Sequence, residues 1–86
     1  MGREYYEMSV TASNINQSFS TSKHHIIVTN RGDDTAYINI NAAATTNSWP
    51  IKKGETFDLM FRGISSIQAI CDSGDTATLE VQGLVG

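Results

Sequence analysis

Apolar and polar residues alternate along much of the chain, and this pattern predicts β-strands. An apolar side chain occupies every second position over residues 4–12, 36–41, 56–61 and 76–82. Successive side chains of a strand point to opposite faces, so each segment offers one apolar face to a core. No window has the i, i+3, i+4, i+7 spacing of an amphipathic helix. The pattern therefore predicts an all-β protein.

Other segments complete the predicted strand order. The continuous apolar run at 26–28 predicts a strand covered on both faces within residues 23–30, and residues 64–71 predict a further strand. Turns rich in Gly and Asp, at 30–34 and 72–75, predict two hairpins. The stretch 13–22 is polar apart from Ile15 and Phe19, so it predicts either a long loop or an arm laid on a neighbouring chain.

These elements together predict one small antiparallel β-sandwich, or a barrel-like variant, of six to seven strands. We place the sandwich domain at residues 23–86 and an N-terminal strand with an extended polar arm at residues 1–22. Composition supports the strands, because thirteen Ile and Val residues stand against three Leu, and side chains branched at Cβ favour strands.

Size and cysteine content indicate association with other chains. A chain of 86 residues buries a modest core, and small domains of this size are commonly supplemented by disulfides, metal ions or oligomerisation. The single cysteine, Cys71, allows no intramolecular disulfide and no cysteine-based zinc site. We therefore expect a homo-oligomer, with exposed sheet edges open to strand addition between chains.

Charge and hydropathy exclude several classes of partner. The net charge is −3, and the six Lys and Arg residues are scattered rather than clustered, which disfavours nucleic-acid binding. No apolar run approaches the length of a membrane span, and the N-terminus lacks the order of a secretory signal. We expect no membrane association and synthesis in the cytoplasm.

The residues with reactive side chains do not form a recognisable catalytic pattern. His24 and His25 are adjacent, so on a strand they point to opposite faces and cannot share one metal ion without further ligands. Cys71 lies in the middle of a predicted strand, as an inert core thiol does. Acidic residues in the two turns could bind calcium but are more simply explained as turn formers: Asp33, Asp34, Asp72 and Asp75. We predict no enzyme activity, no metal and no cofactor.

Aromatic and apolar residues outside the central strands are the candidate binding residues. Tyr5, Tyr6 and Trp49 could stack on sugars, although core or interface use is favoured because small β-domains need large side chains to fill their interiors. The residues that we assign to a partner interface are Tyr5, Tyr6, Met8, Val10, Ile15, Phe19, Tyr37 and Trp49.

Three stretches resemble a group of small β-sandwich structural proteins from the virions of tailed phages and prophages. They read NRGDDTAYINI, AAATTNSWPIKKGETFDL and ISSIQAICDSGDTATLEVQG, and the resemblance covers about residues 25–82. It implies a capsid decoration or cement protein, or an accessory protein of the neck or tail, located in the virion. It implies no catalytic residue.

The expectation is therefore a homotrimer that stabilises the phage capsid, with residues 1–22 crossing to a neighbouring subunit or to the major capsid protein. One alternative is another virion position, in the neck, tail or head fibre. The other alternative is a carbohydrate-binding adhesion module that uses Tyr5, Tyr6, Tyr37 or Trp49.

Overall fold

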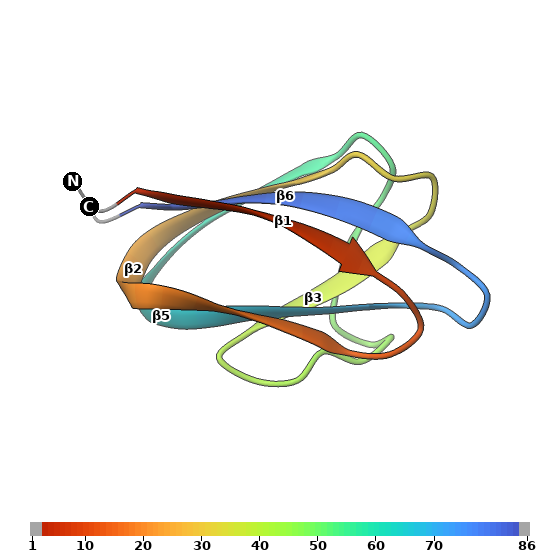
Figure 1. The fold of residues 1–86 in the computed structure, drawn as a ribbon, viewed down its shortest axis with the longest axis horizontal. Helices are drawn as coiled ribbons and strands as arrows, with labels where there is room; N and C mark the ends of the chain where they lie inside the picture. The colour runs from red at the N-terminus through yellow and green to blue at the C-terminus, as the bar shows by residue number, and fades with distance from the viewer. Residues whose placement is uncertain (1–2, 85–86) are drawn as a thin grey trace.

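The protein is a six-stranded antiparallel sheet folded over itself into two layers (Figure 1). The computed structural model describes residues 3–84, and within them it contains strands and no helix. The strands are β1 (Glu4–Val10), β2 (Ile15–Asn30), β3 (Ala36–Ile40), β4 (Trp49–Ile51), β5 (Thr56–Cys71) and β6 (Ala77–Leu84). The predicted all-β antiparallel sandwich is confirmed. Over the described range there is accordingly no helix that could span a membrane.

Two long strands, β2 and β5, create the two layers because each of them bends near its middle. They have 16 residues each and pair along both halves, with register shifts between Ser18 and Lys23 and between Lys23 and His25. Gly63, with a φ of 81°, lies at the same bend in β5. The first layer contains β1, β6, the second half of β2 and the first half of β5. The second layer contains the other halves of β2 and β5 together with β3 and β4.

The core lies between the layers and follows the predicted alternation. In β6 every second residue is buried, so that Ala77, Leu79 and Val81 face the core. Strand β3 contributes Ala36 and Ile38 from the opposite layer, both without exposed surface. Burial of these apolar side chains is the main favourable contribution to folding.

Residues 1–22 do not form an extended arm where the structure describes them. Residues 4–10 form β1, which pairs with β6 from Glu4 opposite Gly83 to Val10 opposite Ala77. Residues 15–22 form the first half of β2. Met8, Val10 and Phe19 are buried in the core. The polarity of this stretch has a simple reason, because its strands have one solvent face and need few apolar residues. Met1 and Gly2, which begin the predicted arm, lie outside the described residues.

The two predicted hairpins are arches between the layers. The turn after β2 leads to β3, but β3 pairs with β4 and β5, and the turn after β5 leads to β6, which pairs with β1 and β2. Asn30 organises the first arch: its buried side-chain amide donates to the carbonyl oxygens of Asp34 and Ile51, both at 2.8 Å. Its Oδ1 accepts from the backbone N–H of Gly32 at 2.8 Å. Turn residues of this kind suit both a hairpin and an arch. Because the strands on either side of each turn lie in different layers, the connections are arches and the hairpin prediction is wrong.

We expect Ile38→Ala to lower the free energy of unfolding by about 2–5 kcal/mol, because it removes a fully buried side chain from the centre of the core. Ile70, on β5, faces away from the core and is half-buried, so Ile70→Ala is the matched control with a smaller loss. Urea unfolding of both variants measures the difference. Equal losses would contradict the assignment of the core to the space between the layers.

Candidate functional site

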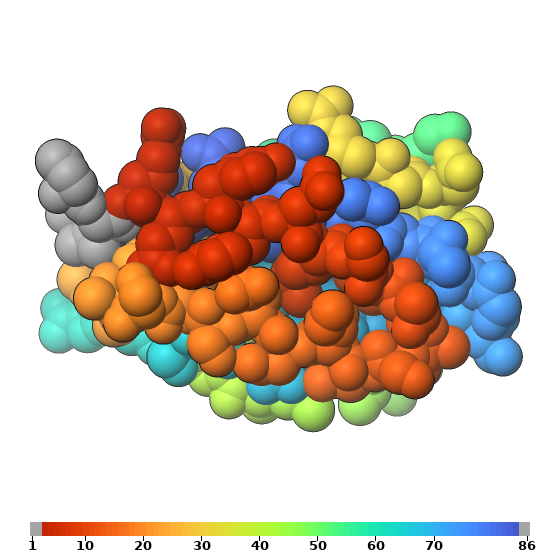
Figure 2. All heavy atoms as spheres, viewed as in Figure 1, coloured from red at the N-terminus to blue at the C-terminus, as the bar shows by residue number. Residues whose placement is uncertain are grey.

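The folded sheet has two sides where the edges of its layers meet, and these sides differ in what covers them. On one side β1 lies against the first half of β2. On the other side β4 lies against the first half of β5, where Trp49 contacts Phe57. We call the first the sealed side and the second the open side. Figure 2 views the sealed side, on which atoms of β1 and of the first half of β2 lie directly against one another.

The sealed side is closed by hydrogen bonds to the carboxylate of Glu4. The backbone N–H of Ser20 donates to both carboxylate oxygens, at 3.0 and 3.2 Å, and its hydroxyl donates at 2.5 Å. The Tyr6 hydroxyl and the Lys23 ammonium also donate to this carboxylate, each at 2.5 Å. The Lys23 side chain has no exposed surface and makes a further bond to the Thr21 hydroxyl, at 2.7 Å. These bonds attach β1 to the bend of β2.

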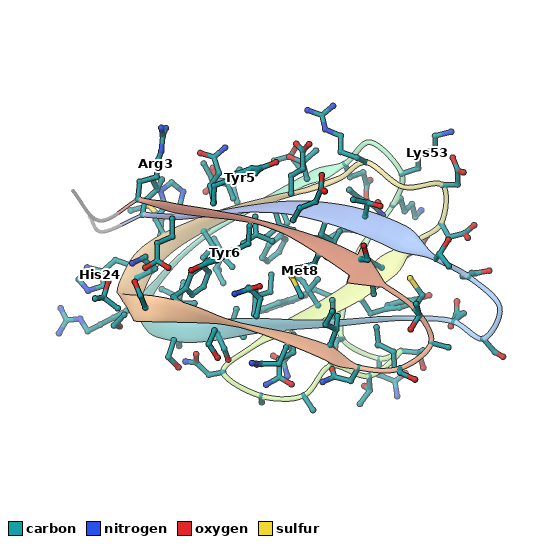
Figure 3. All side chains as sticks on the ribbon, viewed as in Figure 1. Arg3, Tyr5, Tyr6, Met8, His24 and Lys53 are labelled. Carbon is teal, nitrogen blue, oxygen red and sulfur yellow. The ribbon has the colours of Figure 1, made fainter. Side chains whose placement is uncertain are left out.

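Aromatic rings fill the sealed side beneath these polar contacts. The ring centroids of Tyr6 and Phe19 are 6.0 Å apart, and the Lys23 Nζ lies 5.9 Å from the Phe19 ring centroid. A Cβ on Gly83 would lie 2.8 Å from Cε1 of Phe19, so this position is packed without spare room. Tyr6 and Met8 point into the space between the layers, whereas Tyr5 points away from it (Figure 3).

The electrostatics of this cluster suit a structural role. Hydrogen bonds from Lys23, and next from Ser20 and Tyr6, hold the pKa of Glu4 far below its usual range. The bond to Glu4 raises the pKa of Tyr6 in turn. A general base must take up a proton from a substrate. A carboxylate with such a low pKa, whose oxygens already accept several hydrogen bonds, has little affinity for a proton and is a poor general base.

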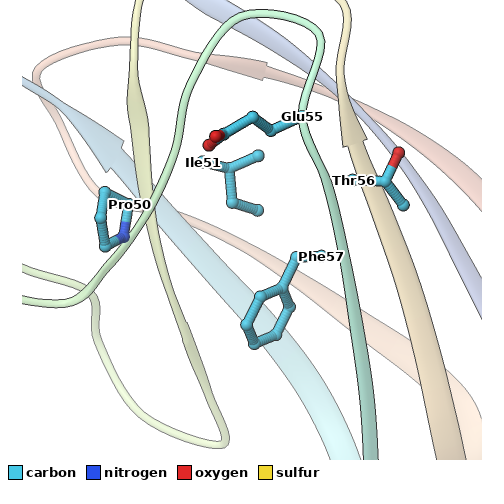
Figure 4. Close-up of a pocket in the computed structure, with 5 residues that line it drawn as sticks. All are labelled: Pro50, Ile51, Glu55, Thr56 and Phe57. Atoms are coloured by element: carbon cyan, nitrogen blue, oxygen red, sulfur yellow. The ribbon is translucent and has the colours of Figure 1, made fainter.

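The open side carries most of the exposed large apolar side chains. Trp49, Met60 and Phe61 are 46%, 76% and 51% exposed, and the other large hydrophobic residue with such exposure among the described residues is Tyr5, at 54%. The rings of Trp49 and Phe57 lie 5.3 Å apart at 33°. Beside them lies a depression of about 320 Å³, shown in Figure 4, whose lining residues are Pro50, Ile51, Glu55, Thr56 and Phe57. We define the open edge as Trp49, Phe57, Met60 and Phe61.

The eight predicted interface residues divide into three groups. Met8, Val10 and Phe19 are core residues of this chain, so their assignment to a partner interface is wrong for this fold. Tyr6 and Ile15 are partly buried against the same core. Three are at least partly exposed and lie on different faces: Tyr5, Tyr37 and Trp49.

Met60 and Phe61 are exposed apolar residues that are absent from the predicted interface. Their neighbours Phe57 and Leu59 alternate toward the core, which places Met60 on the solvent face of β5. An apolar residue at a position where the alternation expects a polar one is the signal that could have identified it.

Several of the polar residues considered for chemistry have structural partners. His25 Nε2 lies 2.6 Å from Asp58 Oδ1. Asp34 accepts from the backbone N–H of Thr76 at 3.0 Å, and Asp72 accepts from the hydroxyl of Tyr37 at 3.2 Å, a bond that raises the pKa of that tyrosine. Over residues 3–84, no three side chains of His, Cys, Asp or Glu converge to hold a metal ion.

Cys71 and the turn at residues 31–33 are held by local packing and ion pairs. The Cys71 thiol is buried, and burial raises its pKa, which disfavours the reactive thiolate. In the Arg31-Gly32-Asp33 turn, Arg31 pairs with Glu80 at 3.0 Å, and Asp33 lies 3.4 Å from Lys53. A Cβ on Gly32 would lie 2.6 Å from the Cα of Ala77, so this turn is packed against the start of β6.

Comparison with known proteins shows similarity at the level of fold. No protein-family model matches the chain, and no curated protein has significant sequence similarity to it. Among solved structures, the fold is similar to a chain from Bacillus endospore appendages, which are described as a novel family of disulfide-linked pili. The TM-score is 0.55 with 8% sequence identity, over 98% of this chain and 86% of that chain. At this identity the similarity concerns the fold alone.

We expect the Glu4 carboxylate to make stability depend on pH. Its pKa in the folded protein lies below the ordinary value of 4.5, so its stabilising effect is complete above that pH and is lost as the pH falls below it. Glu4→Gln should lower stability at neutral pH and remove part of the loss on acidification. Glu7→Gln, on the exposed face of the same strand, is the control. Urea unfolding at neutral and acidic pH measures both, and a Glu4→Gln variant as acid-sensitive as the native chain would contradict the role of Glu4.

Proposed function

We propose that the chain is a structural subunit of a tailed-phage particle, and that it decorates or cements the capsid shell by binding other protein chains. The observation that carries the proposal is the open edge, where three large apolar side chains are exposed beside a strand segment that has a neighbour on one side only. Exposed apolar groups gathered at one place mark interaction sites in small proteins.

Two further observations support this function. The resemblance to small virion proteins covers about residues 25–82, which include β3, β4, β5 and most of β6. The similar fold in a pilus shows that this architecture occurs in a structural protein. Disulfide links are described for that pilus, whereas in this chain the thiol of Cys71 is buried, so we assign the binding to non-covalent contacts.

The number of copies per particle tests the proposal. A shell decoration protein follows the symmetry of the capsid, so we expect hundreds of copies in purified particles of the phage that encodes the chain. Quantitative mass spectrometry against the main shell protein measures this number. About a dozen copies would assign the chain to the neck, tail or head fibre instead, and absence from purified particles would contradict a structural role.

Carbohydrate binding is a second candidate function, favoured by one observation. A depression of about 290 Å³ on the second layer combines the exposed indole of Trp49 with polar side chains, and its lining residues are Ile38, Asn39, Asn47, Ser48 and Trp49. An aromatic face beside amide and hydroxyl groups suits the apolar and polar surfaces of a sugar.

If this depression binds sugars, a glycan array should show binding that Trp49→Ala abolishes. Tyr5→Ala, at an exposed tyrosine on the first layer, should leave that binding unchanged. An array without binding, or binding that survives Trp49→Ala, would remove this candidate.

A further inference from the structure

We propose that two copies of the chain pair through the first half of β5, antiparallel over residues 58–62, so that their first layers join into one continuous sheet. The inference deepens the proposed function and rests on it, because it names the first partner of the structural subunit as a second copy of the same chain. It also identifies which strand makes the contact.

The backbone of this segment is open on one side. β5 pairs with β2 over residues 56–60, whereas β3 reaches β5 only between Ile67 and Cys71. The backbone N–H of Asn30 donates to the carbonyl oxygen of Glu55 at 3.0 Å, so Glu55 directs its carbonyl group toward β2. Alternate residues of an antiparallel strand bond to opposite neighbours. Asp58 and Met60 therefore direct their N–H and C=O groups away from β2, to the open edge.

The side chains of residues 58–62 are complementary to themselves when the segment runs antiparallel. With Met60 on the two-fold axis, Leu59 lies opposite Phe61 of the second copy, and Asp58 lies opposite its Arg62. The segment begins with an acid, ends with a base and is apolar between them. Opposite charges and apolar pairs directly across two strands are each favourable. In this alignment the outward N–H and C=O groups of Met60 form hydrogen bonds with those of Met60 in the second copy.

The single chain leaves these groups exposed. Met60 and Phe61 are 76% and 51% exposed. Arg62 is exposed and takes part in none of the ion pairs found among residues 3–84. The Asp58 side chain is 61% exposed. Its Oδ1 contacts His25, and its other carboxylate oxygen, Oδ2, takes no part in that contact. Pairing would cover the apolar groups and give Arg62 an acidic partner.

The other strand edges are less suited to pairing. β4 has three residues, and Pro50 at its centre has no N–H to donate. The edges of β1 and of the first half of β2 face each other on the sealed side, where the Ser20 N–H already bonds to Glu4. The first half of β5 has neither a proline nor a hydrogen-bonded strand edge facing it.

A second copy fits this edge better than an unrelated chain. The segment has an acid at one end and a base at the other, so an antiparallel copy places opposite charges across from each other. A two-fold contact of this kind uses the same surface on both copies and closes after two chains. The expected trimer would need a different contact, so the stoichiometry of the free protein distinguishes the two arrangements.

Charge reversal tests the pairing. We expect the native protein to show the mass of a dimer in light scattering as its concentration rises. Asp58→Arg and Arg62→Asp should each raise the dissociation constant at least about tenfold, because each places like charges opposite each other across the two-fold axis. The double variant restores opposite charges and should recover native association. Asp33→Arg makes the same charge change on an exposed turn and should have no effect.

The outcomes separate this inference from the proposed function. A native chain that stays monomeric, single variants that associate normally, or a double variant as weak as the single ones would each overturn the β5 pairing. Circular dichroism of each variant checks that the fold is retained. A chain found in hundreds of copies per particle but unaffected by charge reversal would keep the proposed function and reject the pairing. Dimers that respond to charge reversal, from a chain absent from particles, would do the opposite.

Discussion

The contact between Glu4 and Lys23 is the interaction on which the arrangement of the layers depends. A sheet that folds over itself must bend its long strands, and β2 bends where Lys23 is buried. A buried ammonium is costly unless a carboxylate and further hydrogen bonds satisfy it. Glu4 provides the carboxylate from β1, and Thr21 provides a further acceptor. Among the described residues no buried side-chain nitrogen or oxygen lacks a hydrogen-bond partner.

This contact makes the two sides of the sandwich different. It attaches β1 to β2, and the rings of Tyr6 and Phe19 fill the space below. The opposite side has no comparable polar closure in the described part of the chain. Trp49 rests on Phe57, while Met60 and Phe61 extend into solvent. In the proposed pairing, stability and association are thus separated: one side holds the domain together, and the other would offer its strand and apolar groups to a second copy.

Much of the fold could be predicted from alternation alone, whereas the layers could not. The period of two identifies the strands, and Ala77, Leu79 and Val81 are buried as it predicts. Alternation is local, however, and does not show that β5 continues through Gly63 into a second layer, since the bend interrupts the pattern. It also cannot distinguish a hairpin from an arch, because both use the same turn residues.

The candidate site was predicted less well for a related reason. Met8, Val10 and Phe19 have the apolar character of interface residues, and only the pairing of β1 with β6 and the bend of β2 show that they complete the core of the same chain. Met60 is the opposite case: the alternation places this apolar residue on a solvent face, where it would be a sign of association. Composition cannot make this distinction, because the apolar groups of a core and of an interface are chemically alike.

Amide hydrogen exchange at several protein concentrations distinguishes a sealed side from an associating one. The Ser20 amide, bonded to Glu4, should be protected at every concentration, because the sealed side belongs to the single chain. The Met60 amide should exchange rapidly in dilute protein and become protected as concentration rises, because a second copy would then accept its hydrogen bond. Rapid exchange at Met60 at every concentration, or protection at Ser20 that varies with concentration, would contradict the separation of a sealed side from an associating one.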